Sequence, residues 1–390
     1  MSSGSPSGFE FAHRTRIVLG AGVWSQACAE VQSVGSKVLL VTGATSLDTL
    51  GLSAALAEQA ERLGLTFSRF LVPREPDVEL ADRAAAQARA VGAQAVLAIG
   101  GGSALDVAKA AAVLATNPGS ARDYLEGLPS APLAVALPPL PIVCVPTTAG
   151  TGSEVTKNSV LQVVDLQVKR SMRSELLFPR AAFIDPTLSG KAPRGVRAGT
   201  GFDALTHLVE AFCSKNASLI TDALARDGIP RAVRALRALA EGTAGDAEAL
   251  DLAVAATLGG ICLANAGLGA AHGLIAPLGG LYPNIPHGAG LACLLPATLV
   301  VNQAAAASNA AASARLLELA KLISGPYATL TNTAANLTEL RVALGLPALS
   351  SYARIDIPRV VASPSGSLKT NPVPLNASEL SAILELALNV

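Results

Sequence analysis

The sequence lacks an excess of charge of either sign. Its 390 residues include 29 Lys and Arg against 29 Asp and Glu, so the formal net charge is zero. No basic stripe is present to attract nucleic acid, and no block of like charges indicates a solvated tail. We therefore expect no nucleic-acid partner.

The chain also lacks a long apolar run, and its first residues lack the pattern of a leader. The most apolar stretch, residues 131–146, is shorter than a bilayer span and is broken by prolines. The start, MSSGSPSGFEF, has neither the basic nor the apolar region of a signal peptide. We expect no membrane segment, and a loop that leads into a buried strand at 131–146.

Paired cysteines are missing as well. The five cysteines are odd in number, scattered along the chain and never in a CxxC pair, which argues against a disulfide framework or a zinc knuckle. We expect each of them to be a small buried hydrophobe in a protein of the reducing cytoplasm. They are Cys28, Cys144, Cys213, Cys262 and Cys293.

What is present is a large apolar content, 51% of the residues, in a chain long enough for two domains. In the first half, strand-like segments alternate with helix-like ones, which predicts a parallel sheet covered on both faces. The expected strands are 37–43, 65–72, 93–102 and 141–148, and the expected helices are 47–64, 78–92 and 103–116.

From residue 196 onward the sequence is dominated by helical stretches rich in alanine and leucine, such as 220–242 and 313–323. A last helix is expected at 377–388, after an irregular segment, 351–375, that is rich in proline and serine. We expect an α/β dinucleotide-binding domain at 1–190 and an all-α domain at 191–390.

Two loops of the first half follow buried strands. Gly100-Gly101-Gly102-Ser103 stands between a strand and a helix, where glycines let a phosphate approach and the helix N-terminus attracts it. Pro146–Glu154 offers hydroxyls and glycines that suit a nucleotide. The alternatives are a simple turn and a solvated Thr/Gly loop.

Gly43 ends the first expected strand, where many NAD sites carry an acidic residue for the ribose 2′-hydroxyl. No carboxylate follows until Asp48, which leaves space for a 2′-phosphate. Gly43 can equally start an ordinary turn. The cofactor is therefore expected to be NAD or NADP.

Only four histidines occur. His13 lies near the polar N-terminus and is expected at the surface. Asp203 and His207 stand four residues apart, on one face of an expected helix, and His272 and His287 lie in apolar segments rich in glycine. A single histidine of this kind is usually a hydrogen-bonded core residue, but one carboxylate with three imidazoles suits Fe(II) or Zn(II).

Taken together, these motifs resemble the iron-containing (group III) alcohol dehydrogenases over nearly the whole chain. The resemblance is carried, in this order, by GGGSALDVAK (100–109), PTTAGTGSEVTKN (146–158), TGFDALTHLVEAF (200–212) and HGLIAPLGGLYPNIPHG (272–288). It implies the two-domain architecture that this family shares with dehydroquinate synthase, with a metal in the cleft between the domains.

The resemblance also implies site residues. The metal ligands, which are the catalytic residues, fall on Asp203, His207, His272 and His287. The cofactor contacts fall on the pyrophosphate loop (Gly100, Gly101, Gly102 and Ser103), Asp106, Thr147, Thr148, Thr151 and Lys169. The implied protein is a cytoplasmic, homodimeric enzyme that transfers hydride between a small alcohol or aldehyde and NAD(P), with Fe²⁺ or alternatively Zn²⁺.

One position departs from the family pattern. Many members carry a histidine implicated in proton relay four residues after the third metal ligand, and here that residue is Ala276. The ligand set is intact, so the departure affects the path of the alcohol proton and not metal binding.

Three rival functions remain open. A maleylacetate reductase shares the domains, but that branch departs from the DALTH form of the ligand helix. A lyase of the dehydroquinate synthase type is opposed by the few Lys and Arg around 203–288. A non-catalytic nucleotide-binding paralogue is opposed by the complete set of four ligands.

Overall fold

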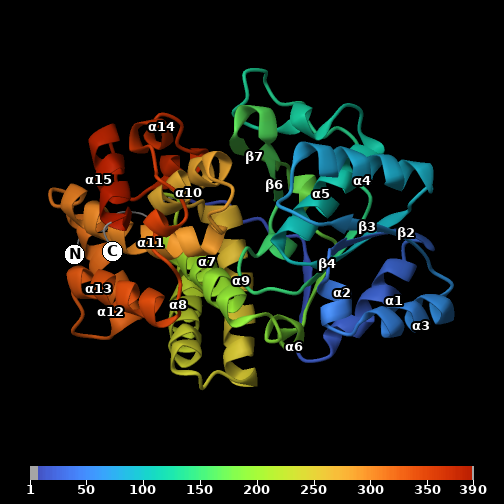
Figure 1. The fold of residues 1–390 in the computed structure, drawn as a ribbon, viewed down its shortest axis with the longest axis horizontal. Coiled ribbons are helices and arrows are strands. Elements are labelled where there is room, and N and C mark those ends of the chain that lie inside the picture. The colour runs from blue at the N-terminus through green and yellow to red at the C-terminus, as the bar shows by residue number, and fades with distance from the viewer. Residues whose placement is uncertain (1–7, 389–390) are drawn as a thin grey trace.

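The computed structural model describes residues 8–388 and has an α/β half and a helical half (Figure 1). No signal peptide is expected at the start of the chain. Most of that start, residues 1–7, lies outside the described residues. The α/β half contains every strand among the described residues, and helices alone follow residue 194.

The centre of the α/β half is a six-stranded sheet in the order β1-β8-β5-β4-β2-β3, and every pair in it is parallel. The predicted parallel sheet is thus confirmed. The sequence did not predict β1, β8 or the separate antiparallel hairpin of β6 and β7. The strands are β1 (Arg16–Leu19), β2 (Lys37–Gly43), β3 (Thr66–Val72), β4 (Ala95–Gly100), β5 (Ile142–Pro146), β6 (Asn158–Val163), β7 (Val168–Arg173) and β8 (Ala181–Ile184).

The sheet is covered on both faces, because its inner strands β2, β4 and β5 are apolar at successive positions and not at alternate ones. In β2, Val38 and Leu40 join the core on one face, while Leu39 and Val41 join the core on the other. The first face packs against α1, α2 and α3, and the second against α4 and α5. These helices are α1 (Ala27–Gln32), α2 (Ser46–Thr49), α3 (Ser53–Leu63), α4 (Val78–Ala90) and α5 (Gly102–Thr116).

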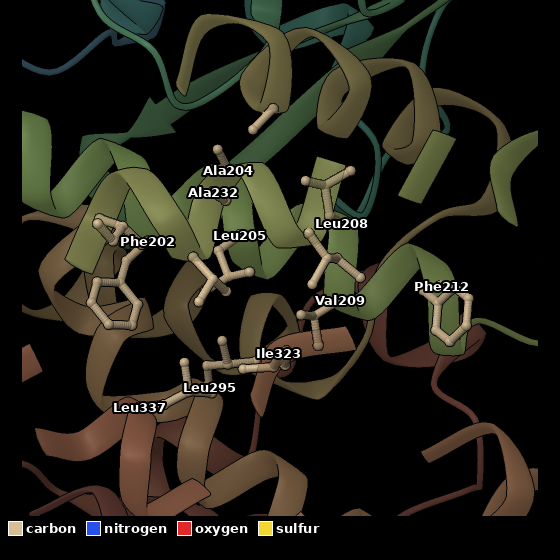
Figure 2. Packing of buried hydrophobic residues seen from close by; sticks show 14 of the residues in the cluster. Phe202, Ala204, Leu205, Leu208, Val209, Phe212, Ala232, Leu295, Ile323 and Leu337 are labelled. Carbon is tan, nitrogen blue, oxygen red and sulfur yellow. The ribbon is translucent and has the colours of Figure 1, made fainter. Parts of the chain in front are cut away.

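The helical half is built around α7, which is buried on nearly all sides from Ala198 to Cys213. Figure 2 shows its apolar side chains, including Phe202 and Leu205, packed with Leu295 and Ile323 of neighbouring helices. After the short α6 (Pro186–Ser189), the helices are α7 (Arg194–Cys213), α8 (Leu219–Glu241), α9 (Asp246–Ala266), α10 (Ala270–Leu281), α11 (His287–Ala305), α12 (Ala310–Ser324), α13 (Leu330–Ala343), α14 (Ile357–Val361) and α15 (Ala377–Leu388).

Two of these helices, α9 and α11, are long and apolar enough to cross a membrane by length and composition alone. In this fold, 61% and 72% of their apolar windows are buried inside the protein. Their hydrophobicity is therefore explained by core packing, since a helix that is apolar all round is one that is buried all round.

Two sequence-based expectations about elements are wrong. The single helix expected at 47–64 is two helices, α2 and α3, because Gly51 between them has a φ of +69°, which a continuing helix cannot contain. The segment 351–375, expected to be a loop, contains α14 and a 3₁₀ helix at Gly366–Thr370.

His13 is not at the surface as expected. Its two ring nitrogens are buried without a hydrogen-bond partner, and its ring packs edge-on against Phe178. The neighbouring Ala12 is held by two hydrogen bonds with Asn265 of α9, which brings this segment into the fold. The expectation for the five cysteines is confirmed, since all of them are buried and free.

The two halves meet closely at two glycines. Gly152, in the loop after β5, has a φ of +60° and lies against Gly260 of α9, where an added Cβ would stand 2.6 Å from the Gly260 Cα. Any side chain at either position would push the halves apart, because backbone atoms cannot rotate away. This contact holds the threonine loop beside the helical half.

Candidate metal centre

A cavity of about 1860 Å³ is lined by residues of both halves. Its lining includes the Gly101–Ser103 loop and Thr148 from the α/β half, and Asp203, His207, His272 and His287 from the helical half. The two kinds of site predicted from the sequence therefore open into one space.

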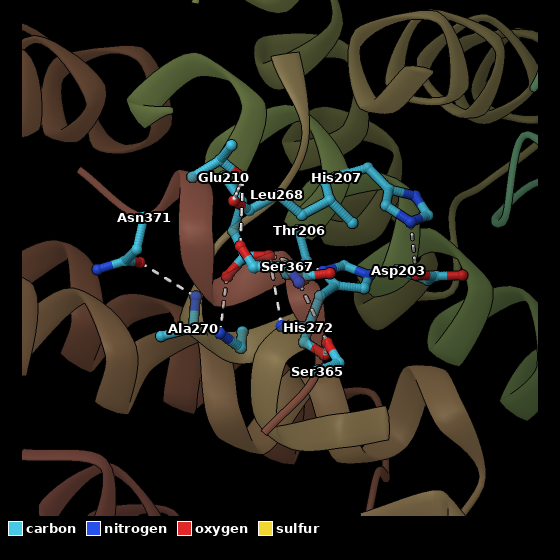
Figure 3. Close-up of polar contacts among 12 residues, drawn as sticks. Asp203, Thr206, His207, Glu210, Leu268, Ala270, His272, Ser365, Ser367 and Asn371 are labelled. Atoms are coloured by element: carbon cyan, nitrogen blue, oxygen red, sulfur yellow. Dashed lines mark hydrogen bonds and ion pairs between the residues drawn. The ribbon is translucent and has the colours of Figure 1, made fainter. Parts of the chain in front are cut away.

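Three helices bring the four predicted ligands together. Asp203 and His207 lie one turn apart on α7, His272 lies in the first turn of α10, and His287 is the first residue of α11. Figure 3 shows the Asp203, His207 and His272 side chains next to one another. The Asp203 Oδ1 atom lies 3.6 Å from His207 Nε2, 3.4 Å from His272 Nε2 and 3.8 Å from His287 Nε2.

Two of the facing atoms of this cluster have no hydrogen-bond partner. Asp203 Oδ1 and His272 Nε2 are buried without a hydrogen bond, and Asp203, His207 and His272 offer ligand atoms that all lie within 4.8 Å of one another. A buried carboxylate oxygen left unpaired is costly, unless a cation or a proton sits beside it. The donor set of one carboxylate and imidazoles fits a divalent transition metal.

The pKa values of the cluster favour the binding of a cation. Burial lowers the pKa of the His207 imidazole to about 4, so His207 is neutral at pH 7. Desolvation also lowers the pKa of His287, whose side chain is 37% exposed. Burial works against the charged form of Asp203 too, but the three imidazoles outweigh it and hold the pKa of Asp203 well below its usual range. Burial also opposes protonation of His272, yet its contacts with Asp203 and Glu210 raise its pKa to about 9. A cation that binds therefore meets an ionised carboxylate and displaces at most the His272 proton.

Glu210 is a residue of this site that sequence analysis missed. It is 4% exposed and its Oε2 lies 2.7 Å from His272 Nδ1. The helical spacing could have revealed it, because Asp203, His207 and Glu210 stand at positions i, i+4 and i+7 of one helix face.

The two predicted nucleotide loops lie against each other at the carboxyl ends of β4 and β5. An added Cβ on Gly101 would stand 3.3 Å from Thr148 Oγ1, and one on Gly102 would stand 2.7 Å from Thr151 Cγ2. Ser103 follows in the first turn of α5, and all five residues line the cavity. Glycines are thus needed here for close packing of the loops, in addition to any approach of a phosphate.

Asp106 connects α5 to the threonine loop and to the hairpin. Its carboxylate accepts hydrogen bonds from Ser153 Oγ (2.7 Å) and from the Val160 amide (3.2 Å), and it lies 3.7 Å from the buried Lys109 ammonium. The pKa of Asp106 is raised by burial, which Lys109 partly offsets. Asp106 therefore braces the walls of the cavity as well as lining it.

Lys169, on β7, also lines the cavity. Its side chain is 12% exposed and its Nζ lies 2.6 Å from Glu75 Oε2. It is therefore not an ordinary solvated lysine.

Three predicted cofactor residues do not line the cavity: Gly43, Gly100 and Thr147. Gly100 lies beside Gly43, since an added Cβ on Gly100 would stand 3.2 Å from the Gly43 amide nitrogen. The Thr147 amide donates to the Gly100 carbonyl at 2.9 Å. These residues pack the carboxyl ends of adjacent strands behind the lining residues.

Glu154, at the end of the threonine loop, provides a pH-dependent prediction. Burial raises the pKa of its carboxyl to about 7 from 4.5, and the Lys109 ammonium only partly offsets this. Its contribution to stability is full below about pH 4.5 and is lost as the pH rises to about 7, because the unfolded chain ionises first. We expect Glu154→Gln to stabilise the protein more at pH 8 than at pH 5, by roughly 1–3 kcal/mol. Urea unfolding of both proteins at the two pH values measures this, and an equal effect at both would contradict it.

Comparisons with known proteins agree with this geometry. The family model "Iron-containing alcohol dehydrogenase" matches residues 14–186, and "Fe-containing alcohol dehydrogenase family, C-terminal" matches residues 197–388. Long-chain-alcohol dehydrogenase 1 of Geobacillus thermodenitrificans is 40% identical over 281 residues, which is 71% of this chain and 69% of that protein. Lactaldehyde reductase of Escherichia coli (strain K12) is 35% identical over 73% of each chain.

Solved structures are similar over nearly the whole length. A 1,3-propanediol oxidoreductase superimposes with a TM-score of 0.86 at 30% identity, covering 98% of this chain and 100% of that one. NADH-dependent butanol dehydrogenase A of Thermotoga maritima has a TM-score of 0.86 at 25% identity, covering 97% and 98%.

Fold and comparisons together define an oxidoreductase that acts on CH–OH groups. The chain belongs to the iron-containing alcohol dehydrogenase family.

Proposed function

We propose that this chain is an NAD(P)-linked alcohol dehydrogenase and aldehyde reductase, with Fe²⁺ or alternatively Zn²⁺ held by Asp203, His207, His272 and His287. The observation that supports this most strongly is the convergence of unpaired, buried ligand atoms at one end of a cavity whose other wall is the glycine loop.

The four side chains fit a divalent ion by chemistry and by position. Three rigid helices carry them, so the site needs little rearrangement to bind. When bound, such an ion supplies a Lewis acid that makes an alcohol hydroxyl far easier to ionise. The protein's part is to fix the ligands and to keep water scarce, which the burial of Asp203 and His207 achieves.

The α/β half is suited to hold the nicotinamide cofactor, which serves as hydride acceptor or donor. The first turn of α5 turns free amides toward the cavity beside Gly102 and Ser103. Thr148 and Thr151 add hydroxyls on the same wall. We assign the pyrophosphate to the amides beside Gly102 and Ser103. We assign the ribose and nicotinamide to Thr148 and Thr151.

Leu263, Leu268, Ala276 and Leu368 are apolar members of the cavity lining, which also includes Lys215 and Lys369. The retained Asp203 and His207 of the ligand helix favour an uncharged alcohol or aldehyde over the maleylacetate reductase alternative. Ala276 offers no group that can carry a proton, so we assign proton removal to solvent or to a ribose hydroxyl of the cofactor.

Reconstitution tests the proposed function. The metal-free protein, loaded with Fe²⁺ or Zn²⁺, is screened with alcohols and aldehydes against NAD(H) and NADP(H) by nicotinamide absorbance. We expect metal-dependent turnover of an uncharged alcohol. Turnover of maleylacetate alone would favour the reductase alternative. Turnover of a phosphorylated substrate without net change in NADH would favour the lyase. A wild-type protein that binds no divalent metal would favour the non-catalytic paralogue.

We further propose the domain limits 1–190 and 191–390, since the strands end at Ile184 and α7 begins at Arg194. The homodimer and the cytoplasmic location stay predictions from the sequence.

A further inference from the structure

Glu210 connects two elements of the metal centre. It lies on α7, one turn beyond His207, and its carboxylate reaches the first turn of α10. Its Oε2 lies 2.7 Å from His272 Nδ1, and its Oε1 accepts the Ala271 amide at 2.7 Å. Both oxygens are therefore used, and the side chain is 4% exposed.

This arrangement determines which nitrogen of His272 carries a proton. An ionised carboxylate can only accept hydrogen bonds, so Nδ1 must be the protonated nitrogen. Nε2, which is buried without a hydrogen-bond partner and faces Asp203 Oδ1 at 3.4 Å, is then the nitrogen left to bind a cation. Carboxylate partners of this kind orient metal-binding histidines in many proteins.

We propose that Glu210 is a positioning residue, which holds His272 in the tautomer and orientation that can bind the metal. The inference rests on the proposed function, because it assumes that His272 is a ligand.

A purely structural role for Glu210 makes a different prediction. Glu210 also caps the N-terminus of α10, a task that it shares with Asn371, whose Oδ1 accepts the Ala270 amide at 3.0 Å. Asn371 makes no hydrogen bond to the His272 ring. Loss of either cap should loosen the helix, but only Glu210 acts on the imidazole.

Glu210→Gln separates the two roles. The Ala271 amide is a fixed donor, so it selects the carbonyl oxygen of the new amide and turns the NH₂ group toward His272 Nδ1. The short capping bond from the Ala271 amide is retained, and the long one from the His272 amide to Oε2 (3.4 Å) is lost. Nδ1 becomes an acceptor and the proton moves to Nε2. That places a hydrogen where the metal should bind.

The experiment measures Zn²⁺ affinity by chelator competition, together with the thermal midpoint of each metal-free protein. We expect Glu210→Gln to weaken Zn²⁺ binding about 10- to 100-fold with little change in the midpoint. Asn371→Ala is the first control: we expect a lower midpoint and an affinity within about threefold of the wild type, the converse of Glu210→Gln. Ser365→Ala is a milder control, which is used if Asn371→Ala does not fold. It removes a hydrogen bond to the His272 carbonyl and leaves the contact of the His272 ring with Glu210 intact.

A spectroscopic readout accompanies the affinity. With Co²⁺ in excess, the visible bands of Glu210→Gln should differ from those of the wild type, because His272 is lost from or weakened in the ligand set. Unchanged affinity and bands in Glu210→Gln, or an equal loss of affinity in either control, would overturn the inference. A wild-type protein that binds neither Zn²⁺ nor Co²⁺ would instead overturn the proposed metal site.

Discussion

Replacing His272 by alanine is expected to lower kcat/KM for alcohol oxidation by at least about 10³-fold. His272 contributes one ligand atom to the metal centre. This atom lies within 4.8 Å of the ligand atoms of Asp203 and His207. Loss of a Lewis acid removes several kcal/mol of transition-state stabilisation, and each 1.4 kcal/mol is tenfold in rate. Binding of NAD(P)H should change little, because the glycine and threonine loops lie on the other wall of the cavity.

Three measurements check this result: metal content, kcat/KM, and cofactor affinity from the fluorescence of NAD(P)H. His13→Ala is a matched control, since the ring nitrogens of His13 are also buried without a hydrogen bond and His13 does not line the cavity. We expect it to keep metal and activity. Chelation of the metal from the wild type should reproduce the His272→Ala phenotype, and added Fe²⁺ or Zn²⁺ should reverse only the chelation. Equal activity in a metal-free His272→Ala protein would contradict the proposed mechanism.

The second large effect is expected from Gly102→Val. An added Cβ at Gly102 would stand 2.7 Å from Thr151 Cγ2 and 3.0 Å from Thr151 Oγ1, so a branched side chain must displace the threonine loop or fill the cavity beside it. Overpacking of this kind costs about 1–3 kcal/mol. We expect the affinity for NAD(P)H to fall roughly 10- to 100-fold, while metal content stays that of the wild type.

Gly245→Val provides the matched control for this substitution. Gly245 also stands at the start of a helix, α9, but an added Cβ there meets nothing closer than Glu248 Oε2 at 3.8 Å. Cofactor affinity in this control should equal that of the wild type. A Gly102→Val protein that binds NAD(P)H normally would show that the loop does not hold the cofactor.

The sequence predicted best where one local pattern was sufficient. The strands from β2 to β5 were found because continuous apolar runs between turn residues have few other interpretations. The hairpin of β6 and β7 was missed because its alternating, partly polar pattern is weaker. The helix expected at 47–64 failed at Gly51, since apolar spacing continues through the sequence even where the backbone turns.

Prediction of the site had a similar limit. Asp203 and His207 could be paired from their spacing on one helix, whereas their proximity to His272 and His287 was implied only by resemblance. Glu210 escaped notice although it lies on the same helix face, because a carboxylate in a helix is usually solvated and the sequence does not reveal its burial.

By itself, the sequence determined the residue types that the chemistry needs and the class of fold. Local periodicity encodes the class of fold, because turns, strands and helices depend on neighbours a few residues apart. Only the tertiary structure decided which of these residues meet. It buried the ring nitrogens of His13, placed three other histidines around one carboxylate, and brought Gly102 against a threonine of another loop. These outcomes depend on how α7, α10 and α11 pack, and on β4 and β5, whose carboxyl ends bring the two loops together. The residues concerned are far apart in the sequence, so no local sequence pattern predicts their contact.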